Sequence, residues 1–184
     1  MIEFKRSGIY DAWKQKATAE KVYPIFQRYL QEQHLDEFNC PLTGSLIQNP
    51  LRDPHGCVFE ASQVQRGFDL ATPGPDGVKR VQCFNAKGKE GQSGITTFTQ
   101  DQFVYDLGYH NRLMQALTPL FLQASKNPAV LSGLNAIRAN VVETRSRMLV
   151  SAVEENSKSV VTGEMSKADF LAHMGALADK LKIA

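Results

Sequence analysis

Residues 40–50 read CPLTGSLIQNP and decide how the middle of the chain is interpreted. A Cys-Pro pair before a short apolar segment is typical of a zinc-finger loop, yet no second Cys follows Cys40 at the spacing of a CxxC pair. A RING-type cross-brace needs two complete sets of zinc ligands, and residues 38–118 contain too few Cys and His for them. The sequence therefore excludes a two-zinc RING, and the loop needs another explanation.

The composition is that of a globular protein, with 42% hydrophobic and 22% charged residues among 184. The formal net charge is +2, so we expect no nucleic-acid partner. No apolar run approaches the roughly 20 residues of a membrane span, and the N-terminus lacks the apolar core of a signal peptide. The three Cys are far apart, which favours a reducing compartment over a disulfide framework. We therefore expect a cytoplasmic location.

The residue composition and the apolar periodicity change twice along the chain, which predicts three segments. Residues 1–37 predict an N-terminal helical segment, because the apolar residues of 22–30 recur at three- and four-residue spacing. Residues 38–118 are dense in Pro and Gly, which predicts loops and short strands. Residues 119–184 return to a helical period and predict a helical hairpin.

The middle zone contains a few short elements between its loops. Residues 57–60 predict a strand, and residues 61–69 predict a short helix. Residues 71–97 predict a polar, Gly-rich loop around a strand or turn at 81–84. The zone ends in a helix that we expect to begin near His110.

Local signals mark the ends of the C-terminal helices. Asn127-Pro128 is a strong start signal, because Asn caps a helix and Pro fits its first turn. The apolar period that follows is broken at Gly163. Ser166 with Asp169 resembles a capping box and starts a last amphipathic helix.

A catalyst with its own nucleophile is the first functional hypothesis to test against the sequence. The three Cys could act as nucleophiles with a nearby His as base, but such a pair needs spatial adjacency and no motif surrounds any of them. Buried Cys commonly serve as small apolar side chains. A structural role is therefore favoured for them.

Residues 40–64 resemble the first half of a U-box domain. The matching positions are Cys40-Pro41-Leu42-Thr43, Pro50-Leu51, Gly56, Phe59-Glu60 and Val64. The second half matches more loosely, with Cys83-Phe84 where the family often has Cys-Pro and Asn111 where it has Pro-Asn before its last helix. The resemblance is confined to residues 38–118 and therefore covers fewer than half of the 184 residues.

The resemblance implies an α+β fold, in which a small, RING-like and zinc-free U-box domain is flanked by N- and C-terminal α-helices. Such a domain holds its two large loops by hydrogen bonds, ion pairs and packing, and each buried polar group then needs a partner. No metal and no cofactor is expected. The structural residues that the resemblance implies are Cys40, Pro50, Glu60 and Asn111.

The implied function is that of an E3 ubiquitin ligase, which binds a ubiquitin-charged conjugating enzyme (E2) without a covalent intermediate of its own. The partners would be the E2, ubiquitin and a protein substrate, and catalysis would consist of positioning. The E2-binding residues that the resemblance implies are Leu42, Thr43, Gly44, Phe68, Phe84, Asn85 and Lys87.

Two departures from the U-box pattern keep other functions open. Gly44 stands where many U-boxes have a bulky residue, and Phe84 replaces the usual Pro, so a RING-shaped adaptor without ligase activity is an alternative. A one-zinc SUMO-ligase domain of the SP-RING type is another, with His55, Cys57 and Cys83 as three of the four ligands that a structural zinc site requires.

A compact chain with a single U-box and divergent loops is similar to the U-box effectors that intracellular bacteria inject into host cells. The acidic pair Glu154-Glu155 near the C-terminus is compatible with some secretion signals. This resemblance implies a role in virulence and a location in the host cytosol.

Overall fold

The computed structural model describes residues 8–84 and 95–181, and it describes only the backbone of 83–84 and 95–96. The chain forms two compact units, of which unit 1 is Met1–Gln33 with Asn111–Ala184 and unit 2 is His34–His110. The terminal zones of the sequence thus share one unit, and the unit boundaries precede the zone boundaries expected after residues 37 and 118. Helices and short antiparallel strands together are compatible with an α+β fold.

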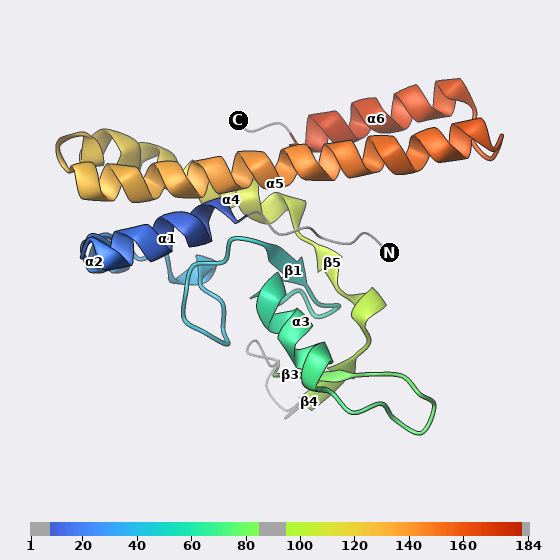
Figure 1. Ribbon diagram of the computed structural model, residues 1–184, viewed down its shortest axis with the longest axis horizontal. Helices are drawn as coiled ribbons and strands as arrows, with labels where there is room; N and C mark the ends of the chain where they lie inside the picture. Colours follow the sequence, from blue (N-terminus) through green and yellow to red (C-terminus); the bar gives the residue numbers. More distant parts are fainter. Residues whose placement is uncertain (1–7, 85–94, 182–184) are drawn as a thin grey trace. The chain divides into compact units, whose positions relative to one another are not determined.

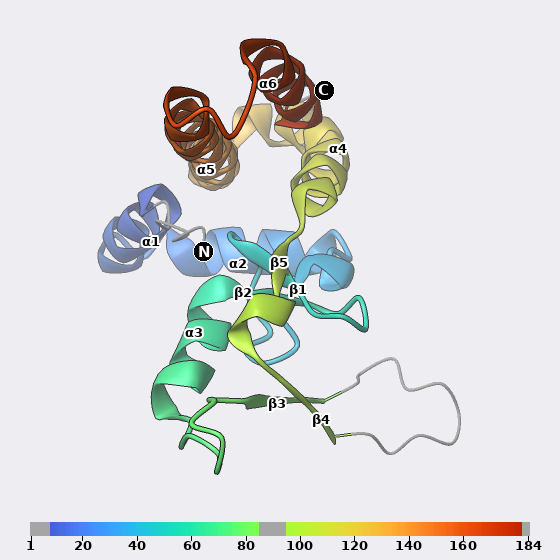
Figure 2. The same cartoon turned by 90° about the vertical axis from the view of Figure 1, so that its right-hand side faces the viewer.

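Unit 1 is built from helices, and its longest helix, α5, contacts α1, α2, η3 and α6 (Figure 1). The helices α1 and α2 contact the N-terminal half of α5, and α6 lies along the C-terminal half (Figures 1 and 2). None of the helices that the structure describes is long and apolar enough to cross a membrane. The elements are α1 (Ile9–Ala19), α2 (Tyr23–Glu32), α4 (Leu107–Gln123, from Asn111 in this unit), η3 (Ala124–Lys126), α5 (Pro128–Val161) and α6 (Lys167–Leu181).

The ends of α5 and α6 are set by the local signals found in the sequence. The Asn127 side chain accepts a hydrogen bond from the Val130 amide at 3.3 Å, which caps the start of α5. Gly163 follows α5 with a φ of +79°, in the left-handed region that favours glycine. The Ser166 hydroxyl accepts a hydrogen bond from the Asp169 amide at 3.1 Å and caps α6.

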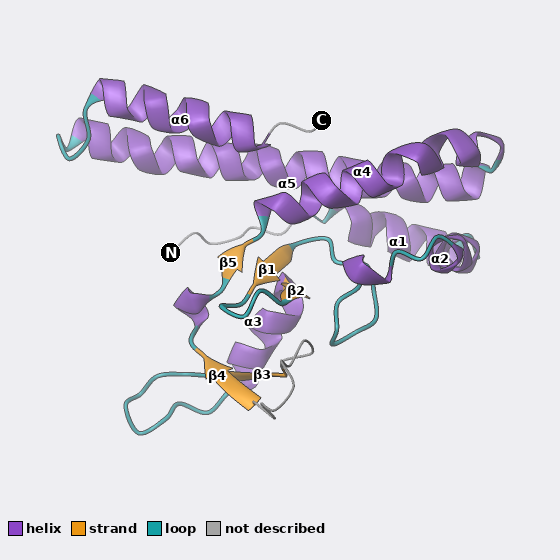
Figure 3. Cartoon of the chain, turned by 180° about the vertical axis from the view of Figure 1, so that it is seen from behind, coloured by secondary structure: helices purple, strands orange, loops and turns teal. Residues whose placement is uncertain are grey.

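The described part of unit 2 contains two small antiparallel sheets, the α-helix α3, two short 3-10 helices and the first residues of α4 (Figure 3). The three-stranded sheet has the order β2-β1-β5, and the helix α3 follows directly after β2. The strand or turn expected at 81–84 is the strand β3, and it pairs with β4, whose first residues fell within the loop expected over 71–97. The elements are η1 (Asp36–Phe38), β1 (Pro50–Arg52), β2 (Val58–Glu60), α3 (Ala61–Leu70), β3 (Val81–Phe84), β4 (Ile95–Phe98), η2 (Gln100–Gln102) and β5 (Val104–Tyr105).

The strand β1 is the centre of the three-stranded sheet, because Leu51 pairs with Phe59 of β2 on one side and Tyr105 of β5 on the other. Pro50 is buried at the first position of β1, a position at which a strand tolerates the missing amide proton. Pro50 was expected to end the first loop, and in the structure it is the first residue of the strand that follows that loop.

Aromatic rings form much of the core of unit 2. Phe68 of α3 lies 5.9 Å from Phe103, and Phe103 lies 6.0 Å from Phe98, with both pairs of rings edge-to-face. All three side chains are buried. Gly67 lets α3 approach β3, since a Cβ on it would lie 3.1 Å from the side chain of Val81.

Replacement of Gly133 by alanine is expected to destabilise unit 1. A Cβ on Gly133, near the start of α5, would overlap the ring of Phe26, which is fully buried on α2. Overpacking of this kind typically costs about 1–3 kcal/mol, more than the ~1 kcal/mol that alanine gains over glycine in a helix. Denaturant unfolding can be followed by the fluorescence of Trp13, the chain's single Trp, whose ring lies 5.1 Å from that of Phe26.

Gly175→Ala is the matched control, because a Cβ on Gly175 of α6 would meet no heavy atom within 4 Å. This variant should gain about 0.5–1 kcal/mol from helix propensity alone. A stabilised Gly133→Ala variant would show that α2 does not pack on α5 as described.

Candidate functional site

The first loop of unit 2 (residues 38–49) is a narrow hairpin held by its own backbone. The Cys40 amide donates to the Ser45 carbonyl at 2.8 Å, and the Gly44 amide donates to the Cys40 carbonyl at 2.8 Å. Gly44 has a φ of +65°, where a side chain is strained. The backbone therefore explains why glycine stands where a U-box often has a bulky residue.

The tip of the first loop is exposed and apolar. Pro41, Leu42, Thr43 and Gly44 are all exposed, and 54% of Leu42 is accessible to solvent. Cys40, one residue before the tip, is only 1% exposed, and its Sγ accepts a hydrogen bond from the Glu60 amide at 3.5 Å. The loop thus buries its Cys and presents its Leu.

Tyr109 binds both sides of the first loop from the start of α4. Its hydroxyl lies 2.7 Å from the Phe38 carbonyl, to which it donates, and 3.1 Å from the Ile47 carbonyl. The Ile47 amide also donates to the Phe38 carbonyl at 2.9 Å. Tyr109 is 2% exposed, so these bonds are shielded from water and keep the base of the loop closed.

His110 supports the end of the same loop. Its ring is fully buried, and Nε2 lies 2.9 Å from the Gln48 carbonyl. A carbonyl oxygen only accepts, so Nε2 carries the proton of this hydrogen bond. Nδ1 lies 3.2 Å from the Tyr105 hydroxyl on β5, which connects the loop to the sheet.

Glu60, at the end of β2, binds the last residues of the first loop through both carboxylate oxygens. Its Oε2 accepts from the Gln48 amide at 2.7 Å and from the Asn49 amide at 3.2 Å. Its Oε1 accepts from the Asn49 side chain at 3.3 Å. Bonds to an ionised carboxylate are about twice as strong as those between neutral groups. The Glu60 carboxylate therefore orders the end of the first loop.

A second loop, residues 53–57, is ordered by a carboxylate in the same way. Asp53 is 3% exposed and accepts hydrogen bonds at 2.9 Å from the amides of both His55 and Cys57. The Asp53 amide in turn donates to the Cys57 carbonyl at 3.0 Å. Residues 38–49 and 53–57 are thus both held by a carboxylate that accepts backbone amides.

The side chains that the structure describes include no group of three or more His, Cys, Asp and Glu that could hold a metal ion. The His55 ring packs against the ring of Phe98 at 5.2 Å, and Cys57 is buried. The Cys83 side chain, the third proposed zinc ligand, lies outside the described part of the chain.

Phe68 is a core residue and not the surface contact that the resemblance implied. Only 3% of it is exposed, because α3 turns this ring toward Phe103. Asn85 and Lys87, two further expected contacts, lie outside the described residues, and Phe84 is described only by its backbone in β3.

Asn111, which the resemblance implied as a structural residue, belongs to unit 1. Its Oδ1 accepts a hydrogen bond from the guanidinium of Arg145 at 2.5 Å. The structural partner of Asn111 is thus Arg145 of α5.

The sequence analysis did not identify Asp106 as a helix cap, although an Asp directly before an apolar helix is a start signal. Its Oδ1 accepts from the Tyr109 amide at 3.1 Å, and its Oδ2 lies 2.6 Å from an Arg52 guanidinium nitrogen. This cap starts α4 at Leu107, earlier than the expected start near His110. Tyr109 and His110 were missed because their partners are distant in sequence.

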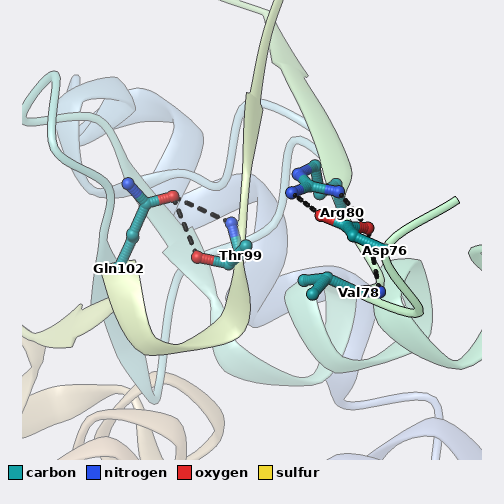
Figure 4. Close-up of polar contacts among 5 residues, drawn as sticks. All are labelled: Asp76, Val78, Arg80, Thr99 and Gln102. Atoms are coloured by element: carbon teal, nitrogen blue, oxygen red, sulfur yellow. Dashed lines mark hydrogen bonds and ion pairs between the residues drawn. The ribbon is translucent and has the colours of Figure 1, made fainter. Parts of the chain in front are cut away.

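Polar side chains also order the segments that flank the β3–β4 hairpin (Figure 4). Asp76 accepts from the Val78 amide and pairs with Arg80, and hydrogen bonds from the Arg80 guanidinium hold the pKa of that carboxyl well below its usual range. Thr99 and Gln102 form a capping box at η2. The hairpin is thus flanked by two segments with their own hydrogen bonds.

No protein-family model matches the chain, and no similar curated protein or solved structure was found. The candidate site consists of two loops ordered by carboxylates, and the first loop carries an exposed leucine at its tip.

Proposed function

We propose that the chain is a U-box-type E3 ubiquitin ligase, whose first loop docks a ubiquitin-charged E2. The observation that carries the proposal is Leu42, which is 54% exposed at the tip of a loop held by Tyr109, His110 and Glu60. Few degrees of freedom are lost when a pre-ordered apolar side chain binds, so a small contact can supply useful affinity.

The proposed mechanism is positioning, and it requires no nucleophile from this chain. Cys40 and Cys57 are 1% and 8% exposed, so neither thiol is accessible for a thioester with ubiquitin. A rigid docking loop would instead hold the E2 thioester where a substrate lysine can attack it. We therefore propose that the protein acts in a eukaryotic cytosol, where charged E2 enzymes occur, as an injected effector would.

Replacement of Leu42 by glutamate should abolish ubiquitin-chain formation in an autoubiquitination screen across a panel of E2 enzymes. The substitution removes the apolar side chain at the centre of the contact and puts there a charge that must be desolvated. Together these changes typically cost about 2 kcal/mol or more in binding. E2 affinity, measured by titration of labelled protein, should fall at least about 30-fold.

Leu70→Glu is the matched control, because Leu70 is also an exposed leucine of unit 2, at 76%, and lies at the end of α3. It should retain chain formation, and circular dichroism should show both variants folded. A wild-type protein that forms no chains and binds no E2 in the panel would refute the ligase proposal.

A RING-shaped adaptor is the second candidate, and the burial of Phe68 favours it because one expected E2 contact is unavailable. An adaptor would bind a partner protein through the Leu42 loop without promoting ubiquitin transfer. An adaptor of this kind has lost E2 binding, so a titration of E2 against labelled protein that shows no binding would favour this function over the ligase.

A further inference from the structure

Two polar side chains, Asn140 and Thr144, lie within the buried stripe of α5 and are called the buried pair below. They follow the apolar Ile137 and Val141 at a spacing of three residues, so they share the same buried side of the helix. Asn140 is 0% exposed and Thr144 is 5% exposed. Among the described residues, neither Asn140 Nδ2 nor Thr144 Oγ1 has a hydrogen-bond partner. Nearly all buried polar atoms in folded proteins have one, so the pair calls for a ligand.

The Asn140 side chain faces the start of α1. Its Oδ1 lies 3.5 Å from the amide of Tyr10, in the first turn of α1, where backbone amides have no partner within their own helix. The opposite orientation of the carboxamide would set Nδ2 against that amide, donor against donor. Oδ1 is therefore the atom that faces Tyr10, and Nδ2, with two protons to donate, points away from the Tyr10 amide.

Other polar side chains on the helices of unit 1 bond back to their own helix. The Thr118 hydroxyl donates to the Met114 carbonyl at 2.8 Å, and Asn156 Nδ2, on α5 itself, donates to the Ala152 carbonyl at 2.7 Å. A carbonyl four residues earlier is thus within reach of either residue type. The buried pair makes no bond of this kind. Its polar atoms are therefore directed toward a partner outside the backbone of α5.

The spacing of the buried pair suits one bridging water molecule. Residues four apart on a helix have Cβ atoms about 5–6 Å apart. Asn140 Nδ2 and Thr144 Oγ1 do not bond each other directly. Two hydrogen bonds of about 2.8 Å through one water oxygen span up to roughly 5.5 Å. A single water can therefore reach both side chains at once.

We propose that one water molecule is bound between Asn140 and Thr144 as a permanent part of unit 1. Its oxygen accepts a hydrogen bond from Asn140 Nδ2, and it forms a second bond with the Thr144 hydroxyl, which can donate or accept. Buried polar sites with unmet hydrogen bonds are the places where proteins retain water. The water also fixes the carboxamide whose Oδ1 faces the Tyr10 amide, so it links the middle of α5 to the start of α1.

The test is the number of long-lived water molecules in the full chain, measured by the magnetic relaxation dispersion of water oxygen-17. Oxygen-17 does not report the hydroxyl protons that exchange with solvent. Proteins hold roughly one buried water per 27 residues, so the informative quantity is the difference between variants. Thr144→Val replaces the hydroxyl by a methyl group of similar size and should hold one long-lived water fewer than wild type. Its urea midpoint, followed by Trp13 fluorescence, should fall because Asn140 Nδ2 loses its ligand.

Two control variants should keep the number of long-lived waters of wild type. Thr144→Ser retains a hydroxyl at the site, and Thr118→Val removes an exposed hydroxyl that already bonds its own helix. Circular dichroism should show all three variants folded.

Three outcomes would overturn the proposal. The first is an equal number of long-lived waters in wild type and Thr144→Val. The second is a higher urea midpoint in Thr144→Val, since a buried hydroxyl without a ligand is better replaced by an apolar group. The third is the loss of a water in Thr118→Val, because the change would then not be specific to the buried pair. The pair belongs to unit 1 and not to the first loop, so none of these outcomes depends on ubiquitin transfer.

Discussion

Replacement of Glu60 by alanine should lower the free energy of unfolding of unit 2 by about 2–4 kcal/mol, because several charge-assisted hydrogen bonds are lost together. The amides of Gln48 and Asn49 both donate to the Glu60 carboxylate, and both residues are buried. In the alanine variant these donors lose their acceptor, so the end of the first loop opens.

Hydrogen exchange at the Gln48 and Asn49 amides is the direct measurement for Glu60→Ala, since it reports on this loop and not on unit 1. Protection should fall at these two amides and at the base of the loop. Glu60→Gln keeps one acceptor oxygen and should lose about 1 kcal/mol. Glu37→Ala, at an exposed position of η1, should change stability by less than about 0.5 kcal/mol. Unaltered protection in Glu60→Ala would contradict the proposed role.

The same variant also connects loop order to the proposed activity. If a pre-ordered Leu42 docks the E2, loss of the Glu60 contacts should weaken E2 binding without touching the docking side chain itself. Glu60→Gln should then lie between wild type and Glu60→Ala in both exchange and affinity.

Replacement of Arg145 by alanine is the second change with a large expected effect, a loss of about 2–4 kcal/mol in the stability of unit 1. Arg145 is 4% exposed on α5, donates to the Leu181 carbonyl at 2.9 Å and donates to Asn111 at 2.5 Å. These bonds hold the C-terminus of α6, where a cation is favourable, and the part of α4 in this unit.

Trp13 fluorescence during unfolding measures the stability of unit 1 in Arg145→Ala, and exchange in α6 shows whether that helix frays first. Arg147→Ala is the matched control, because Arg147 forms an exposed pair with Glu143 at 2.6 Å. Such a pair contributes about 0.5 kcal/mol or less. Similar losses in the two variants would show that the buried contacts of Arg145 do not hold α6.

The start of α5, its end and the start of α6 were predictable from sequence because each depends on a few adjacent residues. Asn127 caps α5 through an amide three residues away, and Ser166 caps α6 in the same way. Gly163 between them adopts the left-handed backbone that glycine favours. Local chemistry of this kind is present in any short window of the sequence.

The strands and loop contacts of unit 2 were harder to predict because their partners are distant. β1 and β5 have three and two residues, too short to show an alternating pattern. Tyr109 resembles any aromatic residue of an amphipathic helix, and only the fold brings its hydroxyl to the first loop. Phe68 illustrates the opposite error, since a family pattern suggested a surface contact that core packing removes.

The hydroxyl of Tyr109 has a consequence for the order in which the chain acquires its structure. It contacts the carbonyls of Phe38 and Ile47 across 71 and 62 residues of sequence. The first loop therefore stays without these bonds until synthesis has passed Tyr109, whereas the α5–α6 hairpin closes through neighbours in sequence. Long-range closure of this kind slows folding. On the ribosome, the loop that carries Leu42 is completed late in the synthesis of unit 2, when nearly all of that unit has been translated.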